Sequence, residues 1–108
     1  MRLLLAEDER ALSKALATIL ERSNYSVDTV YDGEAALEYL AADNYDGVIL
    51  DIMMPKKDGI MVLKELRSRG SKIPVLILTA KSATKQLPGI HKALTRVVSG
   101  LFGTVFDI

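Results

Sequence analysis

Acidic side chains follow two apolar runs of this sequence. Glu7, Asp8 and Glu9 come directly after the first run, and Asp51 closes a second. Carboxylates that are brought into one cluster repel each other, so such a cluster needs a cation. Because the ligand atoms are oxygens and no His or Cys lies nearby, a hard ion is favoured, Mg²⁺ above all. A bound Mg²⁺ can in turn hold a phosphoryl group.

The same positions offer a nucleophile and a hydroxyl donor. A carboxylate can accept a phosphoryl group as an aspartyl phosphate, which makes Asp51 a candidate phosphoacceptor. Thr79 follows a third apolar run and could donate its hydroxyl to a phosphoryl oxygen, with Lys81 and Ser82 just beyond. Each residue also has a plainer interpretation, since a lone aspartate is often a cap and residues 7–9 alone suit a solvated first helical turn. Their joint placement favours a site.

The elements that must position these residues alternate between strands and helices. The expected order is strand, helix, strand, helix, strand, helix, strand, over residues 2–6, 9–23, 25–33, 34–43, 46–51, 58–70 and 73–80. This alternation over short connections implies a parallel sheet with helices on both faces. Ligands bind such a sheet at the carboxyl ends of its strands, near the point where strand order reverses.

Hydrophobic spacing refines three of these elements. The strand at 25–33 alternates apolar and polar residues and closes on Asp-Gly, which indicates an edge-side strand and a turn. On the helix at 58–70, the buried stripe is expected at Ile60, Leu63 and Leu66. The run at 73–80 is the most continuous, as expected for a central strand covered on both faces.

Composition limits the class of protein. The 108 residues suffice for one small domain, 1–108, and no domain boundary stands out. A formal net charge of zero argues against a dedicated nucleic-acid binder. The absence of Cys excludes disulfides and thiolate chemistry and is compatible with the cytoplasm. No apolar run approaches the length of a membrane span, and the first residues lack the features of a signal peptide.

Five stretches within residues 1–82 together resemble the receiver domain of two-component response regulators, of the type joined to winged-helix DNA-binding domains. They read LLLAEDE, YDGEAALEYL, YDGVILDIMMPKKDG, VLKELR and IPVLILTAKS. The resemblance implies a flavodoxin-like, doubly wound parallel sheet. It also implies a phosphoaccepting signalling module and not an enzyme in the usual sense, because a receiver assists its own phosphotransfer and is consumed as substrate.

The resemblance assigns roles to the acidic residues. Asp51 would take a phosphoryl group from the phosphohistidine of a sensor histidine kinase. Glu7 and Asp8 would be the acidic pair, with Asp8 and Asp51 as direct Mg²⁺ ligands. The backbone carbonyl of Met53 would be a third protein ligand of the Mg²⁺.

Other roles follow from the same resemblance. Thr79 would be the switch hydroxyl that moves towards the phosphoryl group, and Pro55 and Gly59 would shape the loop after the phosphoacceptor. We expect a cytoplasmic protein without direct nucleic-acid or membrane contacts. Any role in transcription regulation would belong to a longer relative that carries an output domain.

The ending departs from the family. After Ser82 the family continues to a fifth strand that ends in Lys-Pro and a final helix, whereas this chain has no Lys-Pro pair. The lysine that contacts the phosphoryl group thus has no counterpart, and the last helix is expected to be missing. For residues 83–108 we expect a helix at about 86–99 and a short strand after it. A changed reading frame and an engineered or naturally divergent ending are both open origins.

Three functions are therefore considered. The first is the phosphoaccepting module, which uses Mg²⁺ and Asp51. The second is a degenerate or truncated receiver that keeps the fold and acts, if at all, by protein contact; the missing lysine favours it. The third, a flavodoxin-like nucleotide or flavin binder, is disfavoured because no Gly-rich phosphate loop follows the first strand.

Loss of the last helix would leave one face of the sheet partly bare. Exposed apolar surface of this kind favours association or disorder. We therefore expect either a homodimer that covers an exposed sheet or helix face, or a marginally stable monomer. Analytical ultracentrifugation with thermal unfolding tests this expectation, and a compact, heat-stable monomer would contradict it.

Overall fold

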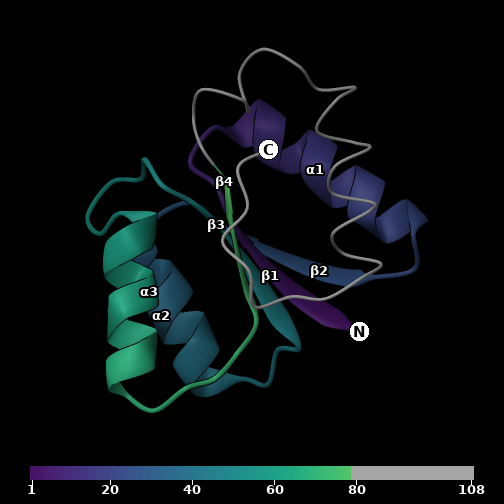
Figure 1. Ribbon diagram of the computed structural model, residues 1–108. Helices are drawn as coiled ribbons and strands as arrows, with labels where there is room; N and C mark the ends of the chain where they lie inside the picture. The colour runs from purple at the N-terminus through teal and green to yellow at the C-terminus, as the bar shows by residue number, and fades with distance from the viewer. Residues whose placement is uncertain (79–108) are drawn as a thin grey trace.

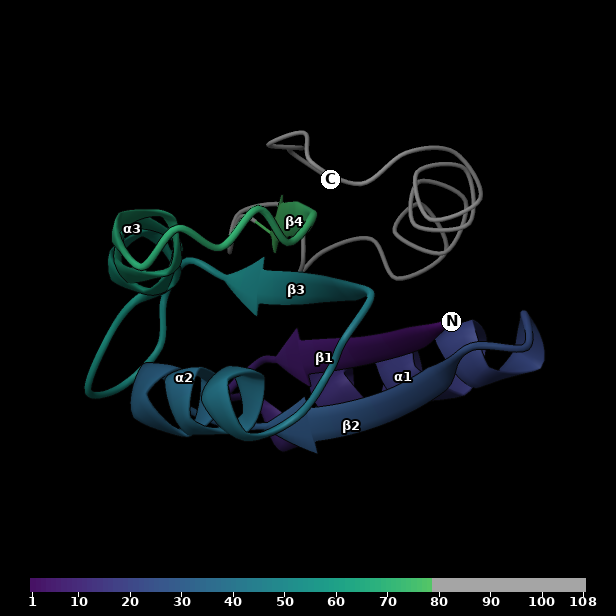
Figure 2. The same cartoon turned by 90° about the horizontal axis from the view of Figure 1, so that it is seen from below.

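Four parallel strands alternate with three helices in the computed structural model, which describes residues 1–78 of the chain (Figure 1). In chain order they are β1 (Arg2–Ala6), α1 (Arg10–Arg22), β2 (Ser26–Val30), α2 (Gly33–Ala42), β3 (Gly47–Asp51), α3 (Gly59–Ser68) and β4 (Val75–Leu78). The strands pair in the order β2-β1-β3-β4, so strand order reverses at β1. The predicted alternation and the doubly wound parallel sheet are confirmed, and β1, β2 and β3 point the same way in Figure 2.

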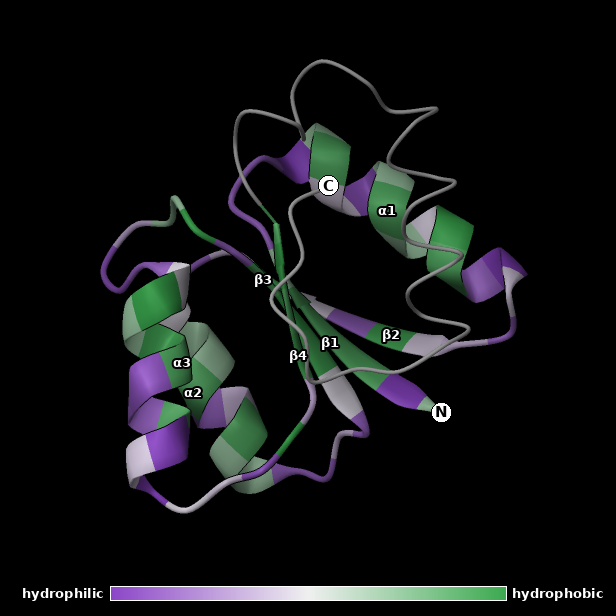
Figure 3. Cartoon of the chain, viewed as in Figure 1, coloured by the Kyte–Doolittle hydropathy of each residue, from purple (hydrophilic) through white to green (hydrophobic). Residues whose placement is uncertain are grey.

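The two faces of the sheet carry separate hydrophobic cores. Side chains alternate between the faces along a strand, so Leu3 and Leu5 pack with α1, whereas Leu4 and Ala6 pack with α2 and α3. Figure 1 shows α1 on one face and the α2–α3 pair on the other. The hydropathy colouring of Figure 3 shows mainly hydrophobic residues along β3 and β4, and a mixture of hydrophobic and hydrophilic residues along β2. Residues on both faces are thus held by close packing.

Burial distinguishes the strands as the sequence predicts. Every residue of β3 and β4 is buried, and β4 contributes to both cores, as a strand covered on both faces must. Its predicted central position is not seen within residues 1–78, where β4 is last in the strand order. β2 lies at one end of the strand order, and most of its residues are partly exposed. The edge-side position predicted for β2 is therefore confirmed.

Aspartates cap two of the helices. Asp32 begins α2 by accepting a hydrogen bond from the backbone N–H of Ala35 at 2.8 Å. Asp58 begins α3 in the same way through the N–H of Met61, also at 2.8 Å. Gly70 follows α3 in a left-handed conformation with φ 84°, which ends the helix near the predicted position.

The helices within the described residues are too short to cross a bilayer. They contain 13, 10 and 10 residues, whereas a membrane span needs about 20 predominantly apolar residues. None of them qualifies as a candidate span.

The buried stripe of α3 differs from the predicted one. Val62 and Leu66 are buried together with Gly59, whereas Ile60 and Leu63 are only partly buried. Four apolar residues follow one another here, so the pattern fits more than one rotation of the helix. The close approach of Gly59 to the end of β3 decides the rotation and turns Val62 towards the sheet. The prediction was right for Leu66 and wrong for Ile60.

Truncation of Val62 tests this rotation. Val62 is fully buried, so Val62→Ala should lower the free energy of unfolding by about 2 kcal/mol, from lost apolar burial and the cavity left behind. The neighbouring Met61 is 49% exposed, so Met61→Ala should change it by no more than about 0.5 kcal/mol. Urea unfolding of both variants is the measurement, and equal losses would contradict the observed rotation.

Candidate metal centre

Three carboxylates meet at the carboxyl ends of β1 and β3. Ala6 lies opposite Leu50 in the parallel register, so the residues that follow, Glu7 and Asp51, become neighbours. One carboxylate oxygen each from Glu7, Asp8 and Asp51 lies within 4.8 Å of the other two. The predicted convergence of acidic residues from the first and third strands is therefore observed.

Glu7 is held inward by the backbone. Its N–H donates to the carbonyl of Val30 at 3.1 Å, which extends the pairing of β1 with β2 by one residue. Its carboxylate accepts a hydrogen bond from the N–H of Glu9 at 2.8 Å. Glu7 is only 2% exposed, whereas Asp8 and Glu9 are exposed. The plainer interpretation, a solvated first helical turn, is therefore wrong for Glu7.

Asp51 ends β3 on the side of the sheet that α1 covers. Ile49, two residues earlier, belongs to the α1-side core, and strand alternation turns Asp51 the same way. Asp51 is 4% exposed, and within the described part of the chain its Oδ1 is buried without a hydrogen-bond partner. A buried, unpartnered carboxylate oxygen is costly. The oxygen is therefore available to a cation or a phosphoryl group, and Asp51 does not act as a helix cap.

The electrostatics of the cluster favour neutralisation. Burial raises the pKa of Glu7 to about 8, with the Glu9 amide opposing this shift and the charge of Asp51 adding to it. Burial also raises the pKa of Asp51 to about 6, with repulsion from Asp8 adding to this shift and the Met53 amide opposing it. Both shifts have the same meaning: at neutral pH the folded cluster holds negative charge unfavourably unless protons or a cation compensate it.

The donor set fits Mg²⁺. All candidate side-chain ligands are oxygens, as Mg²⁺ prefers, and one of them lacks any other partner within residues 1–78. Octahedral Mg²⁺ with bonds of about 2.1 Å places neighbouring ligands about 3 Å apart and opposite ligands about 4 Å apart. The three oxygens of the cluster lie within 4.8 Å of one another, so one Mg²⁺ could be held directly by some of them and through its bound water by the others.

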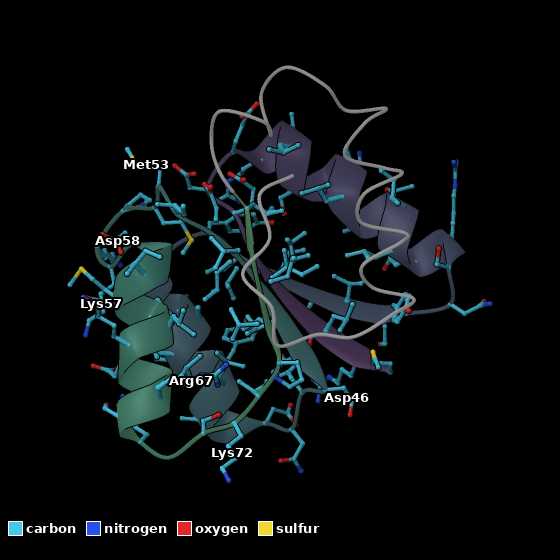
Figure 4. All side chains as sticks on the ribbon, viewed as in Figure 1. Asp46, Met53, Lys57, Asp58, Arg67 and Lys72 are labelled. Carbon is cyan, nitrogen blue, oxygen red and sulfur yellow. The ribbon has the colours of Figure 1, made fainter. Side chains whose placement is uncertain are left out.

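The loop after Asp51 carries Met53, the fourth predicted ligand residue. The side chain of Met53 is 65% exposed and projects from the loop between β3 and α3 (Figure 4). This exposure leaves only the backbone of Met53 for the predicted role, and that role stays a prediction. Thr79, Lys81 and Ser82, like everything expected for residues 83–108, lie outside the described residues.

A glycine on α2 also approaches this loop. Gly33 stands against the backbone of Lys57, and a Cβ at Gly33 would overlap the Lys57 carbonyl oxygen and lie 2.6 Å from Lys57 Cβ. From the sequence alone, Asp-Gly at this point predicts only a turn. The signal that it missed is a long-range contact, which no local pattern reveals.

The pKa shifts predict how charge removal changes stability. Both carboxyls have raised pKa values in the folded state, so losing their protons is harder in the folded protein than in the unfolded chain. The stability that they contribute is therefore fully present below about pH 4 and is lost as the pH rises to about 8. In Mg²⁺-free buffer at pH 8, Asp51→Asn should therefore raise the free energy of unfolding by about 1–3 kcal/mol. At pH 5, where a proton already neutralises Asp51, the gain should shrink.

Urea unfolding in the presence of a chelator measures this difference. Asp46→Asn, which removes a carboxylate at the other end of β3, is the control. An equal gain from Asp51→Asn at the two pH values would contradict the assigned electrostatics.

Sequence comparisons place this geometry in a family. The family model for the response regulator receiver domain matches residues 3–96, which extends past Ser82, where the motif comparison ended. The transcriptional regulatory protein DltR of Streptococcus agalactiae is 48% identical over 84 residues, which cover 78% of this chain. The response regulator MprA of Mycobacterium avium is 41% identical over 86 residues, or 80% of this chain. The chain spans 38% of the length of each of these relatives.

Solved structures agree with the sequence comparisons. The receiver domain of the Francisella response regulator 1452 is 34% identical, with a TM-score of 0.73, over 79% of this chain and 70% of that one. The response regulator TrrA of Thermotoga maritima, solved in complex with Mg²⁺ and BeF, is 36% identical, with a TM-score of 0.72, over 79% of this chain and 74% of that one. With its parallel sheet and acidic cluster, this chain belongs to the response regulator receiver domain family.

Proposed function

We propose that this chain accepts a phosphoryl group on Asp51 from the phosphohistidine of a sensor histidine kinase. The observation that carries the proposal is the buried Asp51 carboxylate, with an unpartnered oxygen, beside Glu7 and Asp8. A carboxylate oxygen of Asp51 forms a bond to phosphorus as the nitrogen–phosphorus bond of the phosphohistidine breaks. The imidazole keeps the electron pair of that bond, and the product is an acyl phosphate.

The residues of the chain contribute position and charge. β3 is buried along its whole length and presents Asp51 from a rigid support. Glu7 and Asp8 supply the negative charge that recruits a cation, with Asp8 and Asp51 as its direct ligands. Mg²⁺, when bound, offsets the charge on the phosphoryl oxygens and on the carboxylates. Catalysis of this kind consists mainly of positioning and charge stabilisation, so the receiver is substrate as much as catalyst.

Two further roles belong to the same proposal. The backbone carbonyl of Met53 completes the protein ligands of the Mg²⁺, and the hydroxyl of Thr79 serves as the switch that contacts the phosphoryl group. The motif match around each residue supports these assignments, since MMPKKDG follows the phosphoacceptor and LTAKS lies at the end of the strand predicted at 73–80.

The cellular context is also a proposal. The relatives described above are named as a response regulator and a transcriptional regulatory protein, and this chain spans only 38% of each of them. We infer that the domain serves as the signal-receiving part of a two-component system in the cytoplasm. Its direct partners would be a histidine kinase and a second copy of the chain, without nucleic-acid or membrane contacts of its own.

A degenerate receiver is the second candidate. The observation that favours it is the absence of a Lys-Pro pair anywhere in the sequence, which leaves the family's phosphate-contacting lysine without a counterpart. Such a protein would keep the fold and the acidic cluster and would act by contact alone. The two candidates differ in a single measurable property, the transfer of a phosphoryl group.

Acetyl phosphate provides the test. We expect incubation with Mg²⁺ and acetyl phosphate to add the mass of one phosphoryl group to the intact protein, and Asp51→Asn to abolish the gain. Asp8→Asn should greatly reduce the gain by removing a metal ligand while the nucleophile stays. Intact-mass spectrometry, with a parallel Mg²⁺ titration by calorimetry, is the measurement.

Each outcome favours one candidate. A gain that depends on Asp51 would show that the acidic centre works without the lysine of the family. Mg²⁺ binding without a gain would favour the degenerate receiver, because the metal centre survives but transfer does not. If the protein shows no Mg²⁺ binding and no gain in mass, the phosphoacceptor proposal is wrong, and the domain is a structural remnant of a receiver.

A further inference from the structure

The loop from Ile52 to Asp58 joins the end of β3 to the start of α3. Its two ends are tied together, because the N–H of Gly59 donates to the carbonyl of Ile52 at 2.9 Å. A Cβ at Gly59 would overlap the carbonyl oxygen of Asp51, so α3 begins in direct contact with the end of β3. Met53 is the second residue of this closed loop, and Figure 4 labels it together with Lys57 and Asp58.

The far side of the loop rests on the first residue of α2. The carbonyl of Pro55 accepts a hydrogen bond from the N–H of Lys57 at 2.7 Å and a long one from the N–H of Gly33 at 3.5 Å. Gly33 is buried against Lys57. A Cβ at position 33 would lie closer to atoms of Lys57 than the Cβ atoms of real proteins lie to their neighbours. The contact joins residues more than twenty positions apart, and only glycine fits there.

The turn at this contact is strained. Lys56 stands between the two hydrogen-bonded residues with φ 67°, a left-handed conformation that non-glycine residues rarely adopt. Its side chain lies 3.8 Å from the Asp32 carboxylate, which already caps α2. Lys56 is largely exposed in this pair, so the attraction is weak. Strain of this kind persists only where the surrounding contacts fix the backbone.

We propose that Gly33 is a positioning residue for the metal centre. By lacking a side chain, Gly33 lets residues 55–57 dock on the start of α2, and the docked loop holds the Met53 backbone beside Asp51. The inference rests on the proposed function, since it takes the Met53 carbonyl as a ligand of Mg²⁺. It adds a residue from a different element, α2, to those that determine the affinity of the centre.

The proposal predicts an effect opposite to that of helix propensity. Alanine is a better helix former than glycine, so a Gly33 that served α2 alone would be improved by Gly33→Ala. A Gly33 that provides clearance for the loop is damaged by the same change. Gly33→Ala should weaken Mg²⁺ binding by about tenfold or more, the scale seen for residues that orient metal ligands.

The experiment compares two neighbouring substitutions in the full chain. Gly33→Ala adds one methyl group against the loop, whereas Glu34→Ala changes an exposed residue of the same helical turn and is the matched control. Calorimetry measures Mg²⁺ binding, and amide chemical shifts of the Mg²⁺-free protein report on the loop directly. We expect Gly33→Ala to shift the amides of residues 52–58 and to weaken Mg²⁺ binding, and Glu34→Ala to do neither.

Lys56→Gly provides a second variant in case Gly33→Ala does not fold. Glycine at position 56 frees the backbone, so residues 55–57 can move away from the added methyl group. The double variant Gly33→Ala/Lys56→Gly should therefore fold, with displaced loop amides and weakened Mg²⁺ binding. Lys56→Gly alone should keep the affinity of the wild type, because the loop still docks on Gly33.

The outcomes separate this inference from the proposed function. Wild-type loop shifts and Mg²⁺ affinity in folded Gly33→Ala, or in the folded double variant, would overturn the positioning role and leave the proposed function standing. A wild-type protein that binds no Mg²⁺ would overturn both, because no metal centre would exist for Gly33 to position. Weakened binding in Gly33→Ala, with Glu34→Ala unchanged, supports both.

Discussion

The parallel register of β1 on β3 is the constraint on which the candidate site depends. Because Ala6 lies opposite Leu50, the next residues of the two strands bring Glu7 and Asp51 together. A slip of one residue in either strand would turn its side chains to the opposite face and separate the two carboxylates. The register is fixed by buried side chains on both faces of the sheet, so the packing of the core also determines the geometry of the site.

The site is costly to the fold that carries it. Two carboxyls are almost fully buried, and burial raises the pKa of each, so at neutral pH their charges oppose folding in the absence of a cation. The cores on the two faces of the sheet must outweigh this cost. A cation that binds only the folded state would return part of it. Cation binding at this cluster would therefore be coupled to stability.

The loop after Asp51 links the site to the helices of one face. Gly59 brings α3 against the end of β3, and Gly33 brings α2 against the loop. Both glycines serve close approach of backbones, at positions where any side chain would collide. The same contacts turn Val62 towards the sheet and hold Lys56 in a left-handed conformation. At these two residues without side chains, α2 and α3 thus pack directly against the end of β3 and the loop that follows it.

The order of the elements, the parallel sheet and the acidic residues at the ends of β1 and β3 could be predicted from the sequence, because these follow from local periodicity and from the alternation of strands with helices. The rotation of α3, the burial of Glu7 and the contact of Gly33 with Lys57 became visible only in the folded structure. Val62 and Ile60 are both strongly apolar, so the sequence does not show which of them is buried. The contact of Gly59 with Asp51 fixes the rotation of α3 and buries Val62. Glu7 is buried because its backbone continues the pairing of β1 with β2. Each of these depends on contacts between residues far apart in the chain, which local patterns do not encode.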